Sequence, residues 1–140
     1  MDNRQIKLLR CVASESRHSV LMLVSEGVGH PDEIAQRTAS TRQAVDKQLD
    51  ILQAAGLVEK KAFTHSTGRP KVLFSVTEVG RKLIHDLEAA LTRYLAAQEK
   101  EFKRAIEHLD LLLLKGELNE EIYQKKVEEM KERYRFLAGA

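Results

Sequence analysis

The sequence predicts a mainly α-helical chain with one small β-hairpin near its middle. Only two of the 140 residues are proline, and helix-favouring glutamate, lysine, leucine and alanine are abundant. Apolar residues recur every three or four positions through most of the chain, which is the spacing of helices that bury one face. The exception is the segment 57–76, where two runs rich in β-branched and aromatic residues flank a loop with glycine and proline.

The composition is that of a chain that can bury a core. Hydrophobic residues make up 43% and charged residues 31% of the 140 residues, which fit one domain or one small domain with a long helical appendage. No apolar run approaches the roughly 20 residues that span a bilayer, and the N-terminus lacks the apolar segment of a signal peptide. We therefore expect a cytoplasmic protein with no membrane partner. The single cysteine, Cys11, is expected to pack as a small hydrophobe rather than to act as a redox sensor.

Two short helices are expected before residue 27. The segment 3–12 is amphipathic, with basic residues between its apolar ones. Its predicted apolar face consists of Ile6, Leu9 and Val12. Ser14 or Ser16 can cap the second helix. Its predicted core face consists of Val20, Leu21, Leu23 and Val24.

The next two helices are expected to be joined by a short turn. Pro31 suits the first position of a short helix over 31–38, and the acidic residues that follow it suit the positive end of the helix dipole. A second helix is expected over 40–55. Its apolar stripe consists of Val45, Leu49 and Leu52. Two helices joined by such a turn, the second with a polar outer face, form a helix-turn-helix.

Both ends of the helix over 40–55 carry termination signals. Ser40 can cap its first turn, and Gln43 can return a hydrogen bond to the Ser40 N–H as in a capping box. Gly56 can supply the left-handed residue that ends the helix. The polar face is rich in groups that bond base edges or phosphates, so the helix is a candidate for insertion into a DNA groove. The alternative is an ordinary solvated surface helix.

The extended runs 57–63 and 71–76 are predicted to pair as a hairpin, and a helix-turn-helix followed by a hairpin is a winged helix. Within the wing, over residues 63–71, the sequence GRPK at 68–71 can hold one arginine extended, a shape suited to a minor groove. Neighbouring side chains that could contact phosphates are His65, Ser66 and Thr67. The alternative is an ordinary polar hairpin tip.

Three segments resemble winged helix-turn-helix transcriptional regulators of the ArsR/MarR-like kind. They are ASESR at 13–17, DEIAQRTASTRQAVDKQLDILQAAGLVEKK at 32–61 and FSVTEVGRKLI at 74–84. The strongest signals are E-I-A in the first motif helix, the exit L-x-x-L-x-x-A-G-L-V, and T-E-x-G-R-x-L after the second strand. The resemblance spans about half of the chain. It implies a homodimer that binds double-stranded DNA, with the second motif helix in the major groove and the wing on the backbone or minor groove.

The resemblance also implies which residues contact DNA. Carried over by position, they are Ser40, Thr41, Arg42, Gln43, Asp46 and Lys47 on the helix, with Arg69 and Lys71 on the wing. Asp46 departs from the family pattern, which often has a small hydroxyl residue at this place. A carboxylate can accept from cytosine N4 but repels phosphates, so Asp46 either reads a base or weakens binding.

From Thr77 onward the chain is expected to be helical. One apolar stripe runs over more than 30 residues, and a helix of about 45 Å is too long to be covered by a small domain. The stripe is broken at 115–116, and Asn119 can cap a further helix with a heptad seam typical of a coiled coil. We expect these stripes to pair two chains; the alternative is a helical hairpin on a monomer. The predicted dimerisation residues are Leu87, Leu91, Tyr94, Phe102, Ile106, Leu109, Leu113, Tyr123, Val127, Met130, Tyr134 and Leu137.

The charge distribution agrees with a division into two parts. The segment 1–82 carries 13 Lys and Arg against 9 Asp and Glu, whereas 83–140 carries 10 against 12. We expect a DNA-binding domain over 1–82 and a helical dimerisation region over 83–140.

Other classes of function fit less well. Asp46 and Asp50 on the presumed DNA face favour the main alternative, a winged helix that docks proteins or binds DNA without sequence preference. There is no Ser/His/Asp order, no phosphate-cradling glycine loop and no carboxylate pair in a plausible cleft, so we expect no enzyme. Scattered histidines and a lone cysteine give no reason to expect a metal site or a cofactor. The sequence does not identify a small-molecule effector.

Overall fold

The structure, a computed structural model, describes residues 1–64, 68 and 70–138. It divides into two compact units, Met1–His85 and Asp86–Ala140. None of the helices in the described part of the chain combines the length and apolar character needed to span a bilayer. The predicted wing-tip residues, which are His65, Ser66, Thr67 and Arg69, lie outside the described residues.

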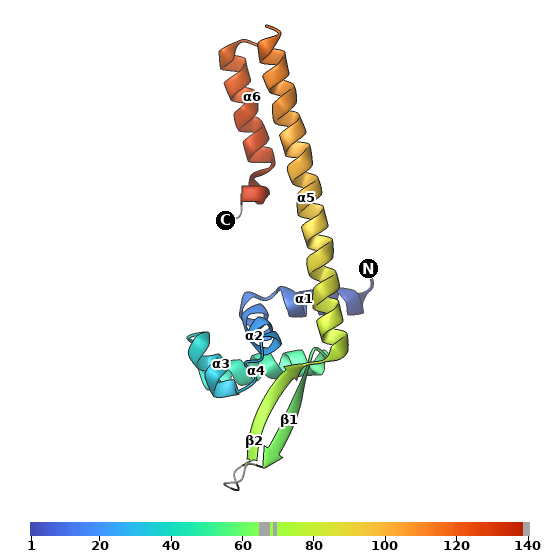
Figure 1. Ribbon diagram of the computed structural model, residues 1–140, viewed down its shortest axis with the longest axis vertical. Coiled ribbons are helices and arrows are strands. Elements are labelled where there is room, and N and C mark those ends of the chain that lie inside the picture. Colours follow the sequence, from blue (N-terminus) through green and yellow to red (C-terminus); the bar gives the residue numbers. More distant parts are fainter. Residues whose placement is uncertain (65–67, 69, 139–140) are drawn as a thin grey trace. The chain divides into compact units, whose positions relative to one another are not determined.

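The N-terminal unit is a winged helix-turn-helix, as the sequence predicts (Figure 1). Its elements are α1 (Asn3–Ala13), α2 (Glu15–Ser25), α3 (Pro31–Arg37), α4 (Arg42–Ala54), β1 (Val58–Thr64) and β2 (Pro70–Val76). The helix α5 (Glu78–Leu114) begins in this unit and continues into the second. Pro31 occupies the first turn of α3, as expected, because its missing N–H costs nothing at that position.

The core of the N-terminal unit lies where α2, α3, α4 and the hairpin meet. The predicted stripe of α4 is completely buried there, together with Leu21 and Ile34. Cys11 is also buried among apolar neighbours, which confirms its packing role. Leu23, which was expected in the core face of α2, is only partly buried at the edge of the cluster.

The predicted apolar face of α1 is wrong at two of its three positions, because only Val12 packs against the core. Leu8, Cys11 and Val12 pack against the core, whereas Ile6 and Leu9 are 38% and 39% exposed. Because this short helix carries apolar residues on two sides, periodicity alone does not decide which side faces inward. The outward pair forms a second apolar face on α1.

The predicted cap of α4 is also wrong. Thr41, not Ser40, is the N-cap, and its Oγ1 accepts from the Ala44 N–H at 3.0 Å. The capping box between Ser40 and Gln43 does not form because the Ser40 N–H is already bonded to Ala35 O at 3.0 Å, where α3 ends. Ala39, with φ of 52°, makes the left-handed turn between these helices. α4 therefore spans Arg42–Ala54 rather than 40–55, and Gly56, with φ of 78°, ends it as predicted.

The hairpin packs on the core with one of its faces. β1 and β2 are antiparallel, with Val58 opposite Val76, and Val58, Phe74 and Val76 are buried. The connection between α2 and α3 lies along β2, because the Phe74 N–H donates to Gly29 O at 2.9 Å. A Cβ at Gly29 would lie 2.3 Å from Phe74 O, so glycine is needed at this close approach.

The C-terminal unit is a helical hairpin formed by the distal part of α5 and by α6 (Glu120–Arg133), which folds back beside it (Figure 1). A 3₁₀ turn, Arg135–Ala138, follows. The predicted break is confirmed by the end of α5 at Leu114. The predicted cap is confirmed as well, since Asn119 Oδ1 accepts from the Ile122 N–H at 2.8 Å.

Candidate nucleic-acid interface

α4 presents a polar face on the outside of the helix-turn-helix. Its buried stripe faces the core, so Gln43, Lys47 and Asp50, which are all exposed, project from the opposite side. Ser40 and Thr41 are exposed at its N-terminal end. The structure therefore brings together the predicted contacts on this helix, which are Ser40, Thr41, Arg42, Gln43, Asp46 and Lys47.

Arg42 is bound by carboxylates from both helices of the motif. Its Nη1 donates to Asp32 Oδ1 at 2.7 Å, and its Nε donates to Asp46 Oδ1 at 2.9 Å. These hydrogen bonds, first that to Asp46 and then that to Asp32, raise the pKa of Arg42 above its usual value. The guanidinium is therefore charged and fully compensated by neighbouring acids. Asp46, expected either to read a base or to repel phosphates, is engaged by Arg42.

The helix-turn-helix as a whole has no excess of positive charge. The segment 31–54 contains three basic residues and four acidic ones, which gives −1. Arg37 is paired with Glu33 at 2.9 Å, as Arg42 is with its two carboxylates. Lys47 has no ion-pair partner among the residues that the structure describes. The charged side chains of this motif therefore supply no net attraction to phosphates.

The hairpin supplies positive charge beside the helix-turn-helix. Lys60, Lys61 and Lys71 are all exposed on its strands. Lys61 Nζ lies 3.8 Å from Glu59 Oε1, and this surface ion pair offsets the charge of the lysine only weakly. Lys71 was predicted as a contact residue, but Lys60 and Lys61 were missed. The signal that could have found them is the position of β1 directly before the wing loop.

Arg17 links helices of the N-terminal unit through contacts that the sequence did not reveal. Its Nε donates to Cys11 O at 2.9 Å and its Nη1 to Gln48 Oε1 at 3.3 Å, so it joins the end of α1 to α4. Its Nη2 also donates to Arg10 O at 3.3 Å. Residue 48 lies 31 positions away in sequence, so no local pattern announces this contact.

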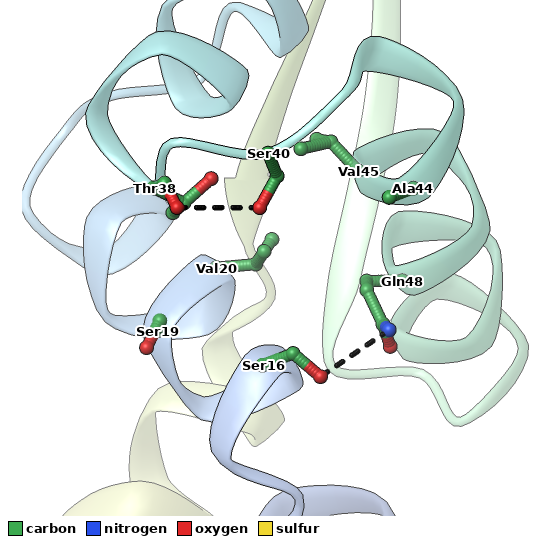
Figure 2. Close-up of a pocket in the computed structure, with 8 residues that line it drawn as sticks. All are labelled: Ser16, Ser19, Val20, Thr38, Ser40, Ala44, Val45 and Gln48. Atoms are coloured by element: carbon green, nitrogen blue, oxygen red, sulfur yellow. Dashed lines mark hydrogen bonds between the residues drawn. The ribbon is translucent and has the colours of Figure 1, made fainter.

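A small crevice lies between α2 and the N-terminal half of α4 (Figure 2). Its volume is about 140 Å³, below the roughly 300 Å³ of the smaller ligand pockets. Gln48 Nε2 donates to Ser16 Oγ across it at 3.4 Å, and Ser40 Oγ donates to Thr38 O at 3.3 Å (Figure 2). The crevice is too small for a drug-sized effector. Its lining consists of Ser16, Ser19, Val20, Thr38, Ser40, Ala44, Val45 and Gln48.

The predicted dimerisation residues separate into covered and uncovered groups. Leu109 is buried, and the ring of Phe102 lies 5.4 Å from that of Tyr134. Leu91 and Tyr94, in contrast, are 61% and 59% exposed. The remaining predicted residues are half-buried: Leu87, Ile106, Leu113, Tyr123, Val127, Met130 and Leu137.

In the part of the chain that the structure describes, no group of three or more histidine, cysteine, aspartate or glutamate side chains is arranged to hold a metal ion.

Several solved structures are similar to this chain in part. An ArsR-like transcriptional regulator from Rhodococcus sp. is 24% identical, over 69% of this chain and 91% of its own, with a TM-score of 0.47. HlyU from Vibrio cholerae is 19% identical, over 64% and 97%, with a TM-score of 0.49. A MepR variant from an S. aureus clinical isolate is 15% identical, over 96% and 86%, with a TM-score of 0.49. No protein-family model and no curated protein matches the sequence. Because these TM-scores lie below 0.5, the winged-helix assignment rests on the elements of the chain itself.

Proposed function

We propose that the protein is a sequence-specific DNA-binding transcriptional regulator that acts as a homodimer. The observation that carries the proposal is the exposed polar face of α4 on the outside of a helix-turn-helix, with exposed lysines on the adjoining hairpin. α4 has the size and polarity of a helix that enters the major groove. The hairpin would lie on the backbone or in the minor groove.

The proposed contacts have different roles. Gln43 and Lys47 project from the outer face of α4, where a side chain can reach base edges. Hydroxyls at the start of α4 suit phosphates, because the N-terminal end of a helix attracts anions. The hairpin lysines add attraction that does not depend on sequence. The proposal retains the wing-tip contacts expected from the sequence, which are His65, Ser66, Thr67 and Arg69.

The proposed homodimer uses the apolar stripe of α5. Leu91 and Tyr94 lie on this stripe and are the most exposed of its predicted members. Exposed apolar stripes on a long helix are typical of surfaces that pair with another chain. Two-fold symmetry would place two copies of α4 in major-groove segments about 34 Å apart, so the expected operator is a pseudo-palindrome.

The experiment that tests this function is selection of bound DNA from a randomised library at two salt concentrations. Recovery of an inverted repeat with half-sites one helical turn apart is the expected result. Affinity should also fall steeply as salt rises, because cations on the hairpin release counterions from the phosphates. Recovery of no motif would reject sequence-specific binding.

A second function, docking of another protein, is favoured by one observation. The helix-turn-helix carries a charge of −1, and both of its arginines are paired with acids. Such a surface is better matched to a basic partner than to DNA. Weak DNA binding with no sequence preference in the selection would favour this alternative.

A further inference from the structure

The helix-turn-helix holds one arginine between carboxylates of its two helices. Asp32 lies in the first turn of α3, Arg42 begins α4, and Asp46 lies one turn further along α4. The two hydrogen bonds are 2.7 Å and 2.9 Å long. We call these three residues the arginine clamp. The clamp contacts the guanidinium from two sides, while 48% of the Arg42 side chain is exposed.

The clamp leaves part of the guanidinium available. A guanidinium has five N–H donors, of which the clamp uses about two. Among the described residues, Nη2 of Arg42 has no acceptor. In the major groove, an arginine with free Nη donors can bond O6 and N7 of one guanine together. Because the side chain is already oriented, forming these bonds costs less conformational entropy.

The clamp also changes how Arg42 responds to phosphates. Two carboxylates around one guanidinium give the group a local charge of −1. Random DNA offers phosphates but no base in register, so it gains little attraction from such a group. A guanine in register offers two acceptors whose geometry matches the remaining donors. The clamp therefore favours base recognition over phosphate binding.

We propose that Asp32 is a positioning residue that makes Arg42 selective for one guanine in each half-site. Asp46 holds the same guanidinium from within α4, so it acts together with Asp32 and not as a separate base reader. This inference rests on the proposed DNA-binding function and deepens it by naming the base. Asp32 itself contacts no DNA in this arrangement.

Two neighbouring variants separate this role from a simple charge effect. Asp32→Asn removes one negative charge and leaves Arg42 only a weaker neutral hydrogen bond on that side, because the amide Oδ1 can still accept. Glu33→Gln removes the same charge from the same turn of α3 but weakens the bond to Arg37 instead. Both pairs are exposed and contribute little to stability, so both variants should fold, which thermal unfolding checks. Glu33→Gln is therefore the matched control.

The measurement compares three kinds of DNA duplex. They are the duplex preferred by the unmodified protein, the same duplex with single guanines changed to adenine, and an unrelated duplex. For the unmodified protein we expect one guanine change to weaken binding roughly tenfold. For Asp32→Asn this penalty should shrink to about twofold, while binding to the unrelated duplex tightens and its salt dependence steepens by about one released counterion. Glu33→Gln should retain the tenfold penalty.

Three outcomes would overturn the inference: an unchanged guanine penalty in Asp32→Asn, equal changes in both variants, or a preferred duplex without such a guanine. Arg42→Lys keeps the charge but loses the forked donors, so it should lose the penalty too. If Arg42→Lys kept the tenfold guanine penalty, that result would also contradict the clamp. If the unmodified protein prefers no duplex, the proposed function fails first, and that result is visible before any variant is examined.

Discussion

The two units of this chain differ in how completely they bury their apolar residues. In the N-terminal unit, 13 buried residues form one cluster, and Leu49 and Leu52 have no exposed surface. In the C-terminal unit, Leu109 is the one buried hydrophobic residue among those described, while Leu91 and Tyr94 stay largely exposed. The first unit has a core of its own, whereas the second is a pair of amphipathic helices with one shared seam.

The difference shows what the C-terminal unit lacks. Helices in proteins are stabilised mainly by packing of their apolar faces. The seam between α5 and α6 reaches Phe102, which meets Tyr134 near the end of α6. The stripe on α5 continues through Tyr94 and Leu91 without cover from the described part of this unit. In the proposed homodimer, a second copy of the chain would cover this stripe.

The largest effect is expected in the core of the N-terminal unit. Leu49→Ala should lower the free energy of unfolding by about 2–5 kcal/mol, because it opens a cavity in a fully buried site. Leu109→Ala provides the comparison in the C-terminal unit. Its cost should depend on protein concentration if the unit is stabilised by association. Urea unfolding at several protein concentrations measures the loss of stability in both variants. If the two variants lost the same free energy of unfolding at every protein concentration, the distinction between the units would be removed.

The next effect concerns the uncovered stripe. Replacing Leu91 and Tyr94 together by serine should weaken self-association at least tenfold, about 1.4 kcal/mol, while the N-terminal unit stays folded. Sedimentation across a dilution series measures this change. Leu111→Ser is the matched control, since Leu111 is also exposed but is not part of the predicted stripe of α5. Equal loss in both proteins would show that the stripe does not define the interface.

A smaller effect is expected at the start of α4. Thr41→Ala removes the side chain that caps Ala44 and should cost about 1 kcal/mol of stability. Ser40→Ala should change the stability by less than about 0.5 kcal/mol, because its exposed hydroxyl does not cap the helix. Thermal unfolding of the two variants distinguishes them. The reverse order would restore the cap expected from the sequence.

The smallest effect is a pH dependence of the C-terminal hairpin. Tyr123 donates a hydrogen bond to Asp110, which raises the pKa of Tyr123 above its usual value near 10. A raised folded-state pKa means that this stabilisation is complete below about pH 10 and is lost as the pH rises through the folded value. Tyr123→Phe should therefore be slightly less stable at pH 8 and indistinguishable from the unmodified protein at high pH. Thermal unfolding over this range tests it, with Tyr94→Phe as the control. A difference that persists at high pH would contradict the assignment.

Most of the fold follows from local sequence patterns. The stripe of α4, Pro31 at the start of α3, and Asn119 before α6 each depend on residues within two turns of one another, so their spacing predicts them. The cap of α4 does not follow, because Ser40 and Thr41 are both good capping residues. Ala35 decides between them, because its carbonyl accepts a hydrogen bond from the Ser40 N–H, which the predicted capping box would have used.

The candidate site is less accessible to sequence reasoning. The outer face of α4 is predictable, since exposed residues lie opposite a buried stripe. The pairing of Arg42 with Asp32 is not, because it joins residues ten positions apart on different helices. Arg17 and its carbonyl partners likewise meet only after the chain has folded. Such contacts depend on packing between elements, which periodicity within one element does not specify.

Thr77 joins two elements of the N-terminal unit through its side chain and its backbone. Its Oγ1 donates to Gly56 O at 2.7 Å, at the exit of α4, and accepts from the Gly80 N–H at 3.0 Å, in the first turn of α5. Its own N–H donates to Leu57 O at 3.0 Å. Gly80 lies so close to this joint that an added Cβ would be 2.6 Å from Leu57 O. One side chain therefore holds the exit of α4 and the first turn of α5 together within the N-terminal unit.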